Sequence, residues 1–265
     1  MTAILAIVLL GFFLGMRHAT DPDHVIAVTT IVSRERKMLH AALIGVLWGV
    51  GHTVTILAVG SAIILFKLTI PPRLELSMEL SVGLMLILLG VLNLTGLMQR
   101  AIEWITNRRL GPGAHSHVIL GRLMIHTHDE DGEPVSAGPG SIFGWTPQWP
   151  KKLSLFQLLR PLTVGIVHGL AGSAAVTLLA LTTINRPSWA IGYLLVFGLG
   201  TIAGMMLITA AIALPFAYTL QHCVRLNRGL AMASGMLSLS FGLFLCYQIG
   251  FVDGLFTSHP NWTPR

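Results

Sequence analysis

Residues 16–24, MRHATDPDH, interrupt the first apolar stretch of the chain. They place one arginine, two histidines and two aspartates inside a run, residues 2–33, that is otherwise almost wholly apolar. An ionisable side chain at the centre of a bilayer costs at least about 2.5–3.5 kcal/mol on insertion scales, so such residues are rare and usually functional. The cluster is therefore a candidate functional site, provided that the surrounding run crosses a membrane.

The overall composition indicates a membrane protein. Of the 265 residues, 53% are hydrophobic and only 11% are charged, and the mean hydropathy is +0.73; soluble domains carry about 25% charged residues. A spanning helix needs about 20 mostly apolar residues. Six segments reach that length: 2–33, 41–66, 78–98, 161–184, 188–216 and 229–252. The predicted fold class is an all-α polytopic membrane protein with about six transmembrane helices.

The distribution of lysine and arginine predicts the orientation of these spans. Most of these residues follow the first, third and fifth spans, and basic loops stay cytoplasmic. We therefore expect a multi-pass protein of the inner (plasma) membrane, with both termini outside and residues 99–160 forming a cytoplasmic loop. Because topology accounts for the net charge of +6, the expected partner is membrane lipid and not nucleic acid.

The sequence repeats itself weakly at an offset near 150. The segment GMRHATDPDH (15–24) aligns with GIVHGLAGSA (165–174), which places His18 over His168. The segment GVGHT (49–53) aligns with GLGTI (198–202). In the third helix of each half, two glycines recur at the same spacing: Gly83 and Gly90, and Gly235 and Gly242.

This repeat predicts two inverted three-helix halves. Each half has an odd number of spans, so the two halves cross the membrane in opposite senses. Many secondary transporters are built this way and bind their substrate at the repeat interface near the midplane. The predicted domains are a first repeat over 1–98, a His-containing cytoplasmic loop over 99–160 and a second repeat over 161–265.

The polar cluster has the chemistry of a transition-metal site. Pro22 has no N–H, so the carbonyl of His18 is expected to lose its helical partner where the helix opens into a cavity. Arg17 is expected to point away from a bound cation and to pair with an aspartate or a carbonyl. Imidazole and carboxylate together suit nickel, cobalt, copper or zinc better than magnesium or calcium. The alternative is that these groups only link helices by hydrogen bonds. The candidate ligands are His18, Asp21, Asp23, His24, His52 and His168.

Several motifs resemble those of a known family. RHATDPDH (17–24) contains His-x4-Asp-His and resembles the RHAxDADH signature of nickel/cobalt transporters. GHTVT (51–55) resembles their second motif, a Gly-His-Ser/Thr in the following helix. VHGLAGSAA (167–175) and FGLGTIAGM (197–205) are similar to motifs of the broader superfamily, including its short urease-associated branch. The resemblance covers all six spans.

The resemblance implies that His18, Asp23 and His24 bind the ion, with Asp21 and His52 beside them. The sequence departs from the family pattern in two places. Pro22 replaces the usual alanine, which strengthens the expectation of a broken helix. The fourth span lacks the carboxylate-bearing motif of the long-chain transporters, so we expect it to contribute His168 alone.

The cytoplasmic loop contains a second group of histidines, in HSHVILGRLMIHTHDED (115–131). Two alternating segments flank Gly121-Arg122, which predicts a hairpin with a two-residue turn. Strand alternation would place all four histidines on one face as an accessory metal site. The alternative is a disordered tract with weak metal affinity. The expected cross-strand pairs are His117 with His126, and His115 with His128.

The predicted function is transmembrane transport of Ni²⁺, with Co²⁺ as the alternative cargo, through a midplane His/Asp site. Uptake is favoured because HGLAGSAA resembles the urease-associated branch, and an importer would deliver its ion to a cytoplasmic metallochaperone. Efflux, and a membrane metal sensor without transport, remain open. We expect no enzyme and no prosthetic group, because the sequence holds neither HExxH nor GxSxG. It also lacks a Walker-type phosphate loop.

Overall fold

The computed structural model describes most of the chain in two compact units. One unit comprises residues 1–94 together with 155–265, and the other comprises residues 95–154. In the described residues the first unit is built from helices, and the second contains two β-strands. The described residues are 2–33, 35, 38–68, 70–96, 114–119, 122–127, 155–183, 186–258 and 260–262.

The first apolar run forms two helices, α1 (Thr2–His18) and α2 (Pro22–Val32), joined by a turn. This confirms the predicted break. Pro22 is the first residue of α2, a position where its missing N–H is not needed. The expectation that the His18 carbonyl would be free is wrong, because the backbone N–H of Asp21 in the turn donates a hydrogen bond to that oxygen at 3.1 Å.

The remaining helices of this unit are long. They are α3 (Met38–Phe66), α4 (Pro72–Thr95), α6 (Leu155–Thr183), α7 (Pro187–His222) and α8 (Val224–Tyr247), the last continued by a short π-helical turn, η1 (Gln248–Val252). In the described part of the chain, four segments are long and apolar enough to span a membrane: Met38–Phe66, Pro72–Thr95, Pro187–Thr219 and Arg225–Val252. The protein is therefore a helical membrane protein. The count of six spans stays a prediction.

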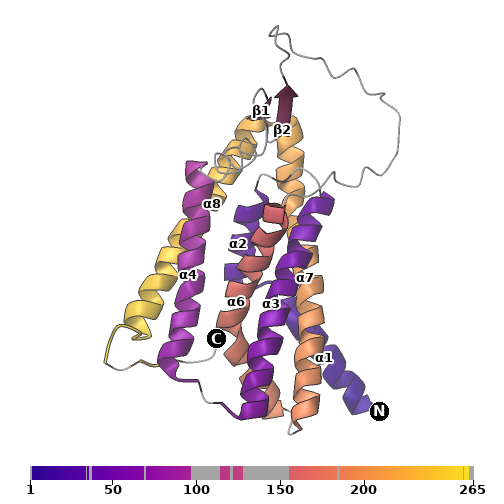
Figure 1. Cartoon of the computed structure of the whole chain (residues 1–265), viewed down its shortest axis with the longest axis vertical. Helices are drawn as coiled ribbons and strands as arrows, with labels where there is room; N and C mark the ends of the chain where they lie inside the picture. The colour runs from indigo at the N-terminus through magenta and orange to yellow at the C-terminus, as the bar shows by residue number, and fades with distance from the viewer. Residues whose placement is uncertain are drawn as a thin grey trace. The chain divides into compact units, whose positions relative to one another are not determined.

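Helix α3 packs against both α6 and α7, while α1 packs against α7 (Figure 1). Helix α2 contacts α7 and α8. Large apolar side chains stay exposed on the outward faces of the bundle, for example Leu84 and Leu88 of α4 and Leu199 and Leu207 of α7. An apolar surface of this extent is unusual for a soluble protein and fits contact with lipid.

Glycines allow several helices to approach at backbone distance. A Cβ at Gly15 of α1 would overlap the carbonyl of Phe197 in α7, and one at Gly165 of α6 would overlap the carbonyl of Trp48 in α3. In membranes such small residues permit the close packing that holds helices together. The first contact brings α1 close to α7, and the second brings α6 close to α3.

The second unit contains an antiparallel hairpin of β1 (Ala114–Ile119) and β2 (Arg122–Thr127). His115 pairs with His126, and Ile119 pairs with Arg122, so the connection is 120–121. The predicted turn at 121–122 and the predicted pair of His117 with His126 are therefore wrong. A two-residue turn accepts glycine at either central position, depending on its type, so the sequence alone left the register open. His128 lies outside the described residues.

Candidate metal centre

His18, the last residue of α1, has both ring nitrogens engaged. Its Nδ1 lies 2.7 Å from Oδ2 of Asp21, and its Nε2 lies 3.2 Å from Nε2 of His52 in α3. The Asp21 carboxylate accepts a hydrogen bond from Nδ1–H, so the lone pair of Nε2 faces His52. The turn between α1 and α2 makes this possible, because it returns Asp21 to the ring.

Asp23, the second residue of α2, connects two helices. Its Oδ1 accepts a hydrogen bond from the backbone N–H of His24 at 2.9 Å and lies 3.1 Å from Nδ1 of the same histidine. Its Oδ2 lies 3.1 Å from Nε2 of His168 in α6. The carboxylate therefore bridges an imidazole of α2 and an imidazole of α6.

His52 and His168 stand near the middle of α3 and α6. Their exposed fractions are 0% and 2%, and that of His24 is 2%. Helix α6 can approach His52 because Gly169 leaves room for the His52 backbone. Close packing of α3 on α6 thus brings two histidines from distant parts of the sequence to the broken span.

Three buried ring nitrogens of this cluster have no hydrogen-bond partner among the described residues. They are Nε2 of His24, Nδ1 of His52 and Nδ1 of His168. Leaving a buried polar atom unpaired costs about 1–3 kcal/mol, and native structures seldom tolerate it without a reason. Three neighbouring imidazoles therefore each have a ring nitrogen that is available to contact a bound ion or molecule.

The ligating atoms fall into two groups. The first comprises His18, His24 and His52, and the second comprises Asp23, His24 and His168. Within each group the ligating atoms lie within 4.8 Å of one another, and His24 belongs to both. Five of the six candidate ligands are therefore brought together. Asp21 belongs to neither group and instead contacts His18 from outside.

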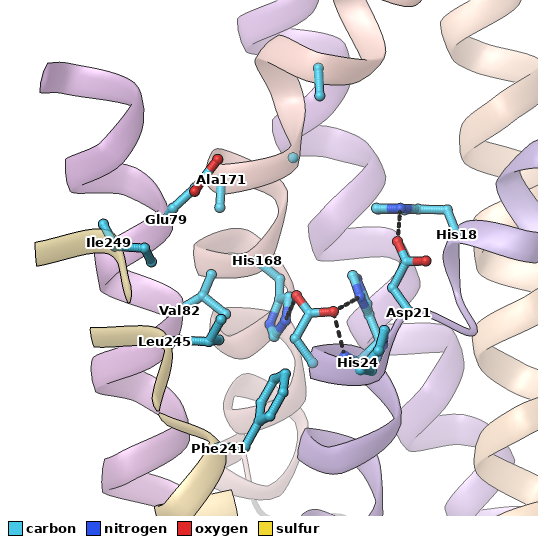
Figure 2. A pocket seen from close by; sticks show the side chains of 14 residues that line it. His18, Asp21, His24, Glu79, Val82, His168, Ala171, Phe241, Leu245 and Ile249 are labelled. Atoms are coloured by element: carbon cyan, nitrogen blue, oxygen red, sulfur yellow. Dashed lines mark hydrogen bonds and ion pairs between the residues drawn. The ribbon is translucent and has the colours of Figure 1, made fainter. Parts of the chain in front are cut away.

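A cavity of about 350 Å³ lies beside this cluster (Figure 2). Asp23, His24 and His168 line one part of it, and Glu79 and Val82 of α4 line another. Side chains from α8 and η1 also line it: Phe241, Leu245 and Ile249. His18 and Asp21 line the cavity as well, so of the five clustered residues only His52 does not.

The sequence analysis missed two residues near the cluster. Trp48 stacks on His24 with ring centroids 5.9 Å apart and planes 14° apart, and it also lies 5.4 Å from His168. Its position four residues before His52, on the same face of α3, was an available signal. Glu79 lines the cavity and accepts a hydrogen bond from Nε1 of Trp262 at 2.8 Å. An acidic residue in an apolar span was the signal for Glu79.

Arg17 does not form the aspartate pair that was one of its two expected pairings. Its side chain is exposed, and neither Asp21 nor Asp23 pairs with it, because both carboxylates are engaged by histidines. The guanidinium therefore does not neutralise the cluster. Four imidazoles and a bridging carboxylate suit borderline divalent metals such as Ni²⁺, Co²⁺ and Zn²⁺.

The fold and this cluster define a helical membrane protein with a buried His/Asp centre. The chain is 36% identical over 253 residues to the urease accessory protein UreH of Bacillus sp. (strain TB-90), and the match covers 96% of each chain. No family model and no solved structure matches the chain. Identity at this level over nearly the full length shows that the chain belongs to the UreH branch of the nickel/cobalt transporter superfamily. The family resemblance noted in the sequence is thereby confirmed.

Proposed function

We propose that the protein carries Ni²⁺ across the membrane, with Co²⁺ as a second cargo. The observation that carries this proposal is the convergence of His18, Asp23, His24, His52 and His168, with three buried ring nitrogens left unpaired. Nickel is preferred among the metals that suit such ligands because the relative is named as an accessory protein of urease, which is a nickel enzyme. The ion is cargo, so no prosthetic group and no catalytic turnover are required.

In this proposal the residues divide into ligands and a positioning group. His18, Asp23, His24, His52 and His168 bind the ion. Asp21 orients His18, as outer carboxylates commonly orient metal-binding histidines. A site near the middle of α3 and α6 would lie close to the bilayer midplane, where carriers of this kind bind their cargo.

We further propose that the two halves, 1–98 and 161–265, are inverted repeats that rock about this site. Reciprocal contacts support the proposal, because a two-fold relation requires each contact to recur between the matched residues. Gly15 against Phe197 is matched by Gly165 against Trp48. Likewise Gly83 faces Gly242, and Gly90 faces Gly235. In each pair, the second contact is the one that the repeat alignment predicts from the first.

The position of the cavity supports uptake. Glu79 and Val82 lie in the first half of α4, and Phe241 and Leu245 lie in the second half of α8. If both termini are outside and residues 99–160 are cytoplasmic, then the first half of α4 and the second half of α8 lie on the outer side of the membrane. The cavity would then admit an ion from outside, and a cytoplasmic metallochaperone would receive it. The histidines of the loop would act as an accessory binding site on the cytoplasmic side.

The decisive experiment is uptake by proteoliposomes that contain the full chain. Ni²⁺, Co²⁺, Zn²⁺ and Mg²⁺ are compared for the unchanged protein, for His18→Ala and for a variant with the four loop histidines changed to alanine. His222→Ala is the matched control, because His222 is exposed and bonds to the carbonyl of Tyr218. We expect nickel and cobalt flux that His18→Ala abolishes and that the other two variants retain. Nickel binding without flux under either direction of gradient would make the protein a sensor and overturn the proposal.

A further inference from the structure

We propose that the ion occupies two overlapping subsites in succession, with His24 shared between them. The outer subsite consists of Asp23, His24 and His168, and the inner subsite consists of His18, His24 and His52. This inference rests on the proposed transport function and adds to it the order in which the ligands act.

The distances separate the two subsites. Metal–nitrogen bonds are about 2.0–2.1 Å for a metal such as Zn²⁺, so two ligands of one ion lie at most about 4.2 Å apart. The ligating atoms of each triad already lie within 4.8 Å of one another, and the described residues form no larger group within that limit. Each triad needs only a small contraction to bind an ion, whereas all five residues cannot bind one ion without a larger rearrangement.

His24 has the geometry of a shared ligand. Its Nδ1 faces Asp23 at 3.1 Å, while its Nε2 is buried and unpaired. Its ring centroid lies 4.4 Å from that of His168 on one side and 4.8 Å from that of His18 on the other. In Figure 2 the labelled His168 and His18 flank His24. The ring can therefore present one nitrogen to each subsite without leaving its place.

The cavity gives the order of the subsites. All three residues of the outer triad line it; of the inner triad, His18 and His24 also line it, but His52 is fully buried and does not. An ion in the cavity therefore completes its contacts with the outer triad before it reaches His52. The carboxylate there attracts a cation that still holds part of its water shell.

The ligand types give the two subsites different selectivity. Magnesium and calcium prefer oxygen ligands, and magnesium also releases water reluctantly, so the Asp23 carboxylate can hold them only in the outer subsite. The inner triad offers three imidazoles and no carboxylate, which suits nickel, cobalt and zinc. Transfer from the outer to the inner triad therefore selects borderline metals, and it releases the ion from the negative charge of Asp23.

The test is X-ray absorption spectroscopy of Ni²⁺ bound to the full chain in detergent. Imidazole rings give a distinct multiple-scattering signal, so the spectrum counts the imidazole ligands of the ion. The parent and every variant carry alanine at the four loop histidines, so that the measured signal comes only from nickel bound at the buried cluster. With two subsites, His52→Ala leaves a site with two imidazoles and His168→Ala leaves one with three. A single merged site would leave three imidazoles in both variants and would overturn the inference.

Flux and folding measurements keep the outcomes distinct. We expect His52→Ala still to bind nickel through the outer subsite and to lose flux, whereas His24→Ala loses both binding and flux. If a variant fails to show the thermal unfolding transition of the parent, His18→Asn replaces His52→Ala and Asp23→Asn replaces His168→Ala. Two subsites again predict two and three imidazoles, whereas a merged site would leave three in His18→Asn and four in Asp23→Asn. If the variants show the counts of a merged site while the parent still moves nickel, only the two subsites are overturned. A parent that neither binds nor moves nickel overturns the proposed function as well.

Discussion

Oδ2 of Asp21 lies 2.7 Å from Nδ1 of His18, while the other nitrogen of the same ring faces His52 at 3.2 Å. The carboxylate holds the proton on Nδ1 and thereby keeps the lone pair of Nε2 directed toward the cluster. It also raises the basicity of the ring as a ligand. In the proposed transport function, Asp21 would therefore act on the ion through His18.

The first prediction concerns this positioning role. Asp21→Ala should weaken nickel affinity about 10–100-fold while leaving maximal flux nearly intact, because a misoriented ligand costs affinity more than it costs movement. Asp21→Asn keeps an oxygen that accepts from Nδ1–H, so it should retain most of the affinity. The measurement is the concentration dependence of nickel uptake. Loss of maximal flux in Asp21→Ala as complete as in His18→Ala would instead make Asp21 a ligand.

The second prediction concerns pH. Nickel binds imidazole only in its neutral form, so protons compete with the ion at the imidazole ligands. Affinity should therefore fall as the pH is lowered. Equilibrium binding in detergent, with the loop histidines changed to alanine, measures this without a transmembrane gradient. Affinity that stays constant from pH 8 down to the lowest pH at which the protein remains folded would contradict binding through imidazoles.

The break in the first span could be predicted from the sequence, but the position of the Asp21 side chain relative to the His18 ring could not. Pro22 between two histidines indicated an interrupted helix, and α1 and α2 confirm it. On a continuous helix, Asp21 would lie on the same face as His18 and His24. Because the helix ends at His18, that spacing does not apply beyond it, and the turn brings Asp21 to Nδ1 of the His18 ring.

Long-range packing limited the rest of the prediction. The repeat alignment related His18 to His168, but only the structure shows that His168 of α6 lies 3.1 Å from Asp23 of α2. Trp48 was missed because its spacing from His52 indicates the face of α3 on which it lies, but not which neighbouring helix that face contacts. Glu79 was missed because it lies at the edge of the predicted span 78–98, where an acidic residue usually faces water.

The third prediction tests backbone contact between helices. Gly165→Ala should lower the free energy of unfolding by at least about 1–3 kcal/mol, because the new methyl group would overlap the carbonyl of Trp48. Gly192→Ala is the matched control, since nothing lies within 4 Å of its Cβ position. That variant should change stability by no more than about 0.5 kcal/mol. Thermal unfolding in detergent compares the two, and equal midpoints would contradict the close approach of α6 to α3.

The fourth prediction tests the contact between the third helices of the two proposed repeats. A Cβ at Gly83 of α4 would lie 2.9 Å from Sγ of Cys246 in α8, a separation that fits a disulfide, in which each Cβ is close to the partner's sulfur. Under mild oxidation Gly83→Cys should therefore cross-link to Cys246. A protease site inserted between residues 135 and 140 makes the link visible, because the cleaved halves stay together only without a reducing agent.

Two controls decide how the cross-link is read. Gly83→Cys combined with Cys246→Ser should give separate halves, since the remaining cysteine, Cys223, lies at the opposite end of α8. Gly90→Cys should also fail to cross-link, because its Cβ position faces the backbone of Gly235 and Leu239 and no sulfur. A link that forms equally with Gly83→Cys and Gly90→Cys would mean that the helices slide past one another. A link that survives Cys246→Ser would place α4 beside Cys223 and contradict the antiparallel pairing on which the two-fold relation of the halves depends.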